Sequence, residues 1–312
     1  PSPPGRGHEF EGLSWPDAGD QLRVLRLASS SGLLVVAHAE HPQILARGAA
    51  EAATLDPADA ATHAAARPPL AEALAVAQLL TLNIEAGARL HIAHVTSAET
   101  LEVLRRFDGS SDFSAETCPQ YLRFTSEDVG RVGVYGKVNP PIRTAADRDA
   151  LWEALNDGTL AHVTTDHAAF SLAEKAAHQG NFLTDPPGHP GTELLLPTLL
   201  DGVAQGRLTL EQVVELVSTN AAARFGLPGR GVLQEGARSD LALVDLAGET
   251  RPSPDTLRTA ARGVARLAHD QSYRGRVAGT FLAGRQVWDG HEVTAPPGIG
   301  SFARPGTSGE AP

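Results

Sequence analysis

Helix-type and strand-type hydrophobic patterns alternate along the first 227 residues. Apolar side chains at helical spacing over 20–31 predict a helix that ends at Gly32. The unbroken apolar run at 33–37 is typical of a strand buried on both faces, as in a parallel sheet. The same patterns predict helices over 68–86, 98–107, 144–156 and 209–224, and strands over 90–95, 113–116 and 160–165. This alternation predicts an α/β fold with a parallel sheet or barrel.

The pattern changes after the last of these helices. Short β runs follow, at 241–244, 276–282 and 285–288. Ala283 and Gly284 are typical of a hairpin turn between the last two runs. We therefore predict a barrel portion at 1–227, a β module at 228–295 and a Pro/Gly-rich tail, exposed or disordered, at 296–312.

Composition narrows the class of protein. The 26 Lys and Arg residues against 37 Asp and Glu residues give a net charge of -11, which argues against nucleic acid as a partner. Cys118 is the single cysteine, no apolar run reaches the roughly 18 residues of a membrane span, and residues 1–7 lack a signal-peptide pattern. We expect a soluble, cytoplasmic protein that does not contact membranes. The only lysines, Lys137 and Lys175, are predicted to have no special role.

Three predicted strands end in residues that commonly bind metal ions. His38 follows the run at 33–37, His94 closes the strand at 90–95, and Asp166 follows 160–165. In βα barrels the catalytic groups project from the carboxyl ends of the strands. Two imidazoles and a carboxylate at neighbouring strand ends could converge on a divalent ion such as zinc. The sequence thus predicts a metal site at this edge.

The segments around these residues resemble the cyclic amidohydrolases, which include hydantoinase/dihydropyrimidinase, allantoinase and dihydroorotase. The resemblance extends from about Leu22 to Pro305 and is specific at the superfamily level. It rests on seven segments in the family's order, at 36–40, 67–72, 91–97, 116–122, 139–143, 165–168 and 190–193.

The resemblance implies a TIM-type (β/α)8 barrel with two divalent metal ions, expected to be zinc, and a β-sandwich built from both chain termini. His38 and His94 would ligate one ion and Asp166 the other. Asp166 would also carry a proton from the attacking hydroxide to the leaving nitrogen of a small cyclic amide or ureide. Homo-oligomers, dimeric or tetrameric, are usual in this family.

The sequence departs from the family pattern at two places. It contains no His-x-His pair, and neither lysine stands where the family has a carbamylated lysine that bridges the metals. The sequence also contains no Met. We therefore expect it to be the C-terminal two-thirds of a longer chain, with the remaining ligands upstream. The rival interpretation is a non-catalytic hydantoinase-like scaffold protein that has lost metal ligands.

Other matched residues leave two interpretations open. By resemblance Asn139 contacts the cyclic amide of the substrate, whereas an Asn before two prolines also favours a turn. His167 could orient Asp166 from the second shell. Arg67 and Glu72 could form a salt bridge or cap, His41 and His91 are expected to pack or to support ligands, and Cys118 to be a buried apolar residue.

The residues after Asp166 indicate a substrate branch. Phe170 stands where dihydroorotases usually have a His that helps to bind the substrate carboxylate, and a phenyl ring donates no hydrogen bond. Gln120 also resembles hydantoinases. We therefore predict that uncharged hydantoins or dihydropyrimidines are preferred, with dihydroorotase and allantoinase as alternatives. In the alternative interpretation, Phe170 only packs behind Asp166.

Overall fold

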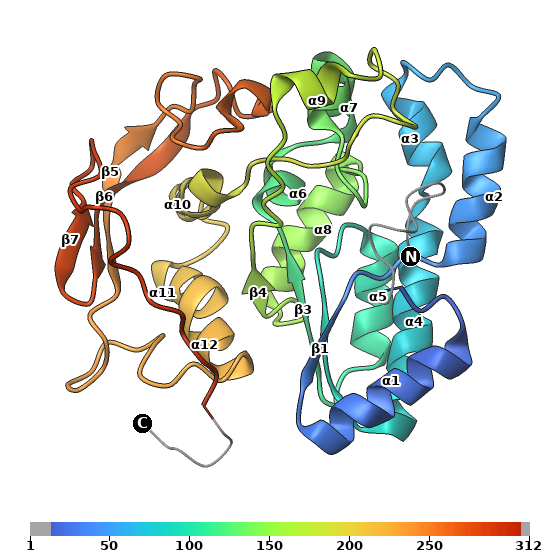
Figure 1. The fold of residues 1–312 in the computed structure, drawn as a ribbon, viewed down its shortest axis with the longest axis horizontal. Coiled ribbons are helices and arrows are strands. Elements are labelled where there is room, and N and C mark those ends of the chain that lie inside the picture. The colour runs from blue at the N-terminus through green and yellow to red at the C-terminus, as the bar shows by residue number, and fades with distance from the viewer. Residues whose placement is uncertain (1–13, 307–312) are drawn as a thin grey trace.

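The computed structural model describes residues 14–306 and contains two sheets (Figure 1). The first is parallel, with its strands adjacent in the order β1 (Leu34–Ala37), β2 (Arg89–Ile92), β3 (Phe113–Thr117) and β4 (His162–Val163). Leu34 pairs with Arg89, Leu90 with Phe113 and Glu116 with His162. Because all four strands run the same way, their carboxyl ends lie at one edge.

Helices connect and cover the parallel strands. They are α1 (Ala18–Ser31), α2 (Pro42–Ala52), α3 (Ala60–Ala66), α4 (Pro69–Ala86), α5 (Ala98–Arg106), α6 (Pro119–Arg123), α7 (Ser126–Val132), α8 (Ala145–Asn156), α9 (Leu172–Ala176), α10 (Leu195–Ala204), α11 (Leu210–Val214) and α12 (Asn220–Arg224). Short 3₁₀ turns occupy Gly133–Gly136, Thr192–Leu194 and Arg262–Val264. A π-helical turn, Glu215–Thr219, joins α11 to α12, within the range predicted as one helix.

Local sequence signals account for several helix ends, including the predicted end at Gly32. Gly32 and Gly87 follow α1 and α4 with φ of 66° and 65°, a left-handed conformation that glycine adopts without a steric penalty. Thr144 and Thr209 begin α8 and α11 with complete capping boxes, in which side chain and backbone satisfy each other's hydrogen bonds.

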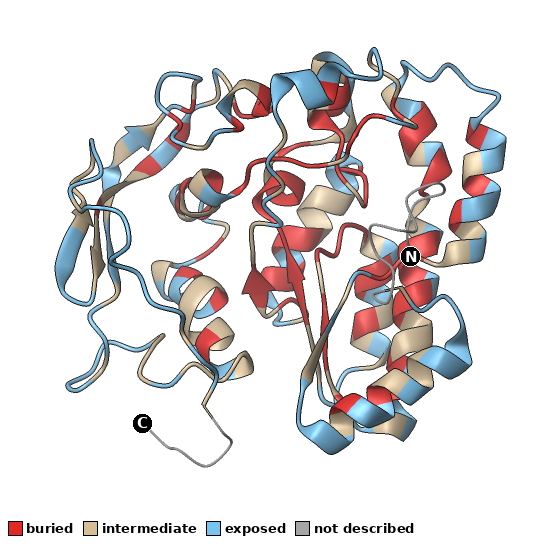
Figure 2. Cartoon of the chain, viewed as in Figure 1, coloured by how far each residue is buried: buried red, intermediate tan, exposed pale blue. Residues whose placement is uncertain are grey.

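One expectation about the sheet is wrong. The run at 33–37 was predicted to be buried on both faces, yet Leu33 is 63% and Val36 53% exposed. The reason is position, since β1 is an edge strand of the described sheet and pairs only with β2. The buried core instead lies around β2, β3, β4 and the helices that cover them, including Leu90, Ile92 and Leu101 (Figure 2).

The second sheet is antiparallel and consists of β5 (Leu241–Thr250), β6 (Tyr273–Leu282) and β7 (Arg285–Trp288). As predicted, Ala283 and Gly284 form the hairpin turn, with φ of 50° and 77°. Helix α10 lies between this sheet and α6 (Figure 1). Its Asp201 carboxylate accepts hydrogen bonds from the Arg123 side chain of α6, at 2.7 Å, and from the Arg274 backbone N–H of β6, at 3.1 Å. The sheet lies within the predicted module; the division into three domains stays a prediction.

Two further features concern the surface and the chain ends. Within residues 14–306, no helix combines the length and the apolar character needed to cross a bilayer. Residues 296–306 of the predicted tail contain no helix or strand, and 307–312 lie outside the described residues, as do the first seven residues discussed above.

Candidate active site

The three predicted strand-end residues come together at one edge of the parallel sheet. His38 follows β1, His94 follows β2 and Asp166 follows β4. The backbones of His94 and Asp166 each have a φ of 41°, a conformation uncommon for residues other than glycine. Such a backbone persists only where the surrounding structure holds it, and it often marks a functional site.

The two histidine rings face each other. His38 Nδ1 lies 2.8 Å from His94 Nε2, so one nitrogen donates and the other accepts, according to tautomer. His94 is buried, and both this burial and the nearby His38 lower its pKa below the usual value. The lowered pKa favours the neutral imidazole, which is the form that binds metal ions.

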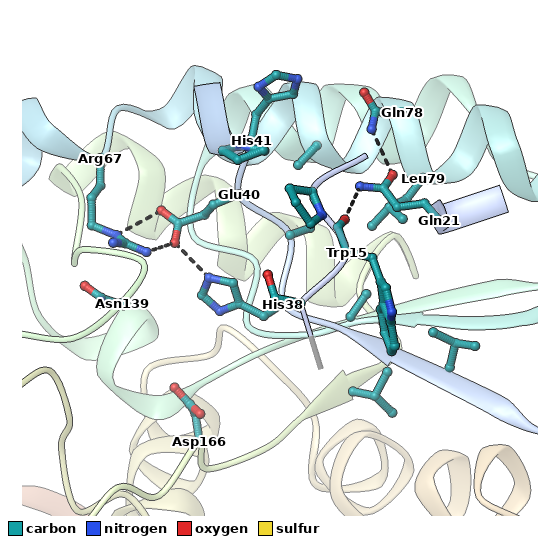
Figure 3. Close-up of a pocket in the computed structure, with 18 of the residues that line it drawn as sticks. Trp15, Gln21, His38, Glu40, His41, Arg67, Gln78, Leu79, Asn139 and Asp166 are labelled. Carbon is teal, nitrogen blue, oxygen red and sulfur yellow. Dashed lines mark hydrogen bonds and ion pairs between the residues drawn. The ribbon is translucent and has the colours of Figure 1, made fainter. Parts of the chain in front are cut away.

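A buried ion pair fixes the other side of His38 (Figure 3). Glu40 Oε2 lies 2.8 Å from His38 Nε2, and the carboxylate also accepts hydrogen bonds from Arg67 Nε, at 3.1 Å, and from Arg67 Nη2. Burial alone would raise the pKa of Glu40, but the His38 hydrogen bond and the Arg67 charge outweigh it and hold this pKa well below its usual range. An ionised Glu40 orients the imidazole so that Nδ1 faces His94.

A second buried carboxylate fixes the segment after His94. Glu72 of α4 accepts hydrogen bonds from the Thr96 backbone N–H, at 3.0 Å, and from the Thr96 hydroxyl, at 2.6 Å. Arg143 Nε in turn donates to the Thr96 hydroxyl oxygen at 3.2 Å. The predicted pair of Arg67 with Glu72 is therefore replaced by two separate contacts, Arg67 with Glu40 and Glu72 with Thr96.

Asp166 lies below His38 and borders the same cavity (Figure 3). Asp166 is partly exposed to solvent, but its surroundings desolvate the carboxylate and raise its pKa above the usual value. The electrostatic effect of His94 opposes this shift, and the charge of Glu116 adds to it. Glu116 is itself held by the His91 ring, at 2.8 Å, and by the Thr164 hydroxyl, at 2.7 Å. His91 thus contacts Glu116, and its support of metal ligands stays a prediction.

The cavity has a volume of about 440 Å³, and its lining includes Asn139 and Phe170. The Asn139 side-chain oxygen is buried and has no hydrogen-bond partner among the described residues. Leaving a buried carbonyl oxygen without a hydrogen-bond donor costs folding free energy. A ligand that donates a hydrogen bond to this atom would remove that cost. Both residues predicted to contact substrate therefore border the cavity.

His167 and Cys118 differ in burial: His167 is exposed and Cys118 is buried. His167 is exposed, and its Nδ1 accepts a hydrogen bond from the Thr192 backbone N–H at 3.3 Å. Among the described residues it makes no hydrogen bond to Asp166, so its orienting role stays a prediction. Cys118 is fully buried, and this burial raises its thiol pKa, which confirms the expected inert residue.

The side chains of His38, His94 and Asp166 carry donor atoms of the kinds that bind divalent metal ions. The two facing imidazole nitrogens and the carboxylate are the nitrogen and oxygen donors that zinc accepts. Within residues 14–306, however, no group of three or more His, Cys, Asp or Glu side chains is arranged to hold an ion. The ligand assignment of His38, His94 and Asp166 stays a prediction.

Both lysines are buried, a feature that the sequence analysis did not predict. Lys137 is 4% exposed and Lys175 is fully buried, although lysine is rarely buried in proteins. Burial lowers the pKa of Lys175 to about 8, against the opposing charge of Asp185. The available signal was their rarity, since a chain with 24 other basic residues, all arginine, has only these two lysines.

Comparison with known proteins defines the class. The amidohydrolase family model matches residues 15–287, and the chain belongs to this family. An allantoinase from Rubrobacter xylanophilus is 38% identical over 93% of this chain and 64% of the relative. A dihydroorotase from Halobacterium salinarum is 34% identical over 86% of this chain and 60% of the relative.

The solved structure of an L-hydantoinase (dihydropyrimidinase) from Arthrobacter aurescens superimposes with a TM-score of 0.88 and 29% identity, over 97% of this chain and 66% of the other. Together with the parallel sheet, this likeness confirms the α/β fold of TIM-barrel type. The chain spans about two thirds of the length of these relatives.

Proposed function

We propose that this chain carries active-site residues of a metal-dependent hydrolase that opens the ring of a small cyclic amide or ureide. The convergence of His38 Nδ1, His94 Nε2 and Asp166 at the strand ends, beside a cavity, carries this proposal. The names of the relatives, allantoinase, dihydroorotase and hydantoinase, all denote enzymes that hydrolyse such rings. We further propose a cytoplasmic homo-oligomer, dimeric or tetrameric.

His38 and His94 would hold one divalent ion and Asp166 a second, with zinc as the expected metal. Bound there, the ions would supply a water acidic enough to attack near neutral pH and would polarise the ring carbonyl. Both lysines of this chain donate to backbone carbonyls, so a carbamylated lysine bridge would not come from them.

The chain's own residues would bind the ring and move the proton. Asp166 borders the cavity, where it can take a proton from the attacking water and give it to the leaving ring nitrogen. The unpaired Asn139 oxygen can accept a hydrogen bond from a ring N–H. Phe170 offers the cavity an aromatic face with no hydrogen-bond donor, which favours uncharged substrates.

Metal analysis is the first test. The full-length protein, supplemented with zinc, should retain about two divalent ions per chain, whereas residues 1–312 alone should bind them poorly. Elemental analysis should be run beside a His38→Ala, His94→Ala double variant, which removes one proposed ion. Less than about half an ion per chain in the parent protein, without turnover, would support the scaffold interpretation instead.

Asp166→Asn is the second test. Asparagine keeps the size of the side chain and tolerates the positive φ, so the variant should fold. Without the proton carrier, kcat should fall at least ~100-fold. Asp255→Asn, at an exposed position, is the matched control. A variant that binds metal and keeps more than about a tenth of parental kcat would show that Asp166 is not the proton carrier.

The substrate class is tested by measuring kcat/KM for dihydrouracil, a 5-substituted hydantoin, allantoin and dihydroorotate side by side. We expect an uncharged hydantoin or dihydropyrimidine to be preferred over dihydroorotate, because an anion against Phe170 would lack a donor at a cost of about 1–3 kcal/mol. Sequence relatives include allantoinases, a dihydroorotase and hydantoinases, and the solved neighbours include hydantoinases and a dihydropyrimidinase. A clear preference for dihydroorotate would overturn the predicted branch but leave the reaction class unchanged.

A further inference from the structure

The two lysines form one buried cluster beside the cavity. Lys175 Nζ donates to the carbonyl oxygens of Val134 and Lys137, each at 3.2 Å, and Lys137 Nζ donates to the Asp185 carbonyl. Neither lysine lines the cavity. The cluster therefore joins α9 and the loop after it to the segment that leads into Asn139.

The carbonyls before Asn139 are bound from several directions. The Gly188 N–H donates to the Lys137 carbonyl at 2.9 Å, and the His63 ring of α3 donates to the Val138 carbonyl at 3.0 Å. Burial lowers the pKa of His63 to about 3, so its ring is neutral at physiological pH. Together with Lys175, these donors fix the backbone immediately before Asn139.

Lys175 also contacts Phe170, a residue that lines the cavity. Its Nζ lies 5.7 Å from the centre of the Phe170 ring, close enough for a cation–π contact. The ring packs on Gly188, where an added Cβ would come within 2.6 Å of it. One ammonium group thus supports both residues that we propose to contact substrate, without reaching the substrate itself.

The fold does not need this ammonium to satisfy its backbone. The Val134 carbonyl also accepts from the Lys137 N–H, at 3.1 Å, and the Lys137 carbonyl also accepts from Gly188. A methionine at 175 would leave each carbonyl with a donor and would remove a buried charge, a change that is often neutral or stabilising. The lysine therefore calls for an explanation other than stability.

We infer that Lys175 is a positioning residue that sets the placement of Asn139 relative to Phe170 and thereby the affinity for substrate. This inference rests on the proposed function, because it assumes that the cavity binds the ring. The charge anchors two carbonyls on one side and an aromatic ring on the other. Its removal loosens both walls while the strand-end residues stay in place.

The test compares Lys175→Met with Ala173→Gln, a control at an exposed position of the same helix. In Lys175→Met we expect KM for the preferred substrate to rise about tenfold, the effect of one lost hydrogen bond to a charged group, with kcat within about twofold of the parent. Amide hydrogen exchange at Gly188 should become faster, whereas exchange in β2 and β3 should not change. The control should match the parent in all three measurements.

Each outcome decides the inference. Unchanged KM and unchanged Gly188 exchange in Lys175→Met would overturn it. A methionine variant that fails to fold would also overturn it, because Lys175 would then have a structural role. A parent protein that turns over none of the four substrates would refute the proposed function; Gly188 exchange would still report whether Lys175 holds the two walls together.

Discussion

Arg67 and Lys175 are two buried cations beside the same cavity, and they differ in their partners. Arg67 donates to the Glu40 carboxylate from two nitrogens, whereas Lys175 donates only to backbone carbonyls. The Arg67 charge helps to hold the pKa of Glu40 well below its usual range, and burial lowers the pKa of Lys175 itself to about 8. A carboxylate therefore offsets the burial of Arg67, whereas Lys175 donates only to neutral carbonyls and burial lowers its pKa.

The difference shows that a buried charge can either stabilise the fold through an ion pair or place neighbouring groups at a cost in stability. The Arg67–Glu40 pair compensates its own burial and fixes His38, so losing either partner leaves an unpaired charge in the protein. Lys175 has no carboxylate within hydrogen-bond distance among the described contacts, so its charge is a cost to the folded state. We attribute its presence to placement of the cavity walls.

The largest effect is expected from Glu40→Ala. The substitution leaves Arg67 buried without a counter-charge and should lower the free energy of unfolding by about 3–5 kcal/mol. Urea denaturation at pH 7 measures it, with Glu85→Ala, which breaks the exposed Arg26 pair, as the control expected to change stability by less than about 1 kcal/mol. Equal losses in the two variants would show that burial does not make the Arg67–Glu40 pair more costly to break than an exposed pair.

The sign of the pH dependence follows from the lowered pKa of Glu40. The contribution of the ion pair is fully present above the unfolded pKa of about 4.5 and is lost as the pH falls through the lower folded pKa. The stability gap between the parent and Glu40→Ala should therefore persist through mildly acidic pH and close only in strong acid.

Lys175 should behave in the opposite way. Its folded pKa of about 8 lies below the usual 10.5, so the penalty for its charge is fully present below pH 8 and disappears as the pH rises toward 10.5. Relative to Lys175→Met, the parent should gain up to about 3 kcal/mol between pH 7 and pH 10.5. Unfolding measured at both pH values tests this, and a constant difference would contradict it.

The other charged and titratable neighbours do not reverse this expectation. Asp185 opposes the pKa shift of Lys175, and His189, whose pKa burial lowers to about 3, stays neutral over the whole range.

The smallest effect is expected from Arg67→Lys, which keeps the charge but not the two-nitrogen contact with Glu40. A lysine ammonium cannot match that planar arrangement, and we expect a loss of about 1–2 kcal/mol. Thermal unfolding of the two proteins measures it. A variant as unstable as Glu40→Ala would show that the geometry of Arg67, and not only its charge, dominates the pair.

Local rules predicted much of the fold. Gly32 ends α1, Thr144 begins α8, and Ala283 with Gly284 turns the hairpin, because each signal acts on its own few residues. Burial depends on neighbours far away in the chain. The apolar run at 33–37 fits the interior of a sheet, but its place at the edge of the described sheet leaves Val36 exposed.

In the candidate site, too, some residues could be predicted from the sequence and others could not. His38, His94 and Asp166 could be predicted because parallel strands bring their carboxyl ends together. The contact of Arg67 with Glu40, 27 residues apart, and that of Lys175 with the Val134 carbonyl, 41 residues apart, depend on how separate loops pack. No periodicity encodes such contacts.

The contacts of Asp201 bear on whether the two sheets unfold together. One buried carboxylate is bound at once by α6, through Arg123, and by β6, through the Arg274 backbone. Detaching the antiparallel sheet would take the Arg274 N–H away from this buried carboxylate and leave Arg123 and Gln205 as its donors. We therefore expect the two sheets to melt in a single calorimetric transition. The small antiparallel sheet then belongs to the same cooperative unit as the parallel sheet.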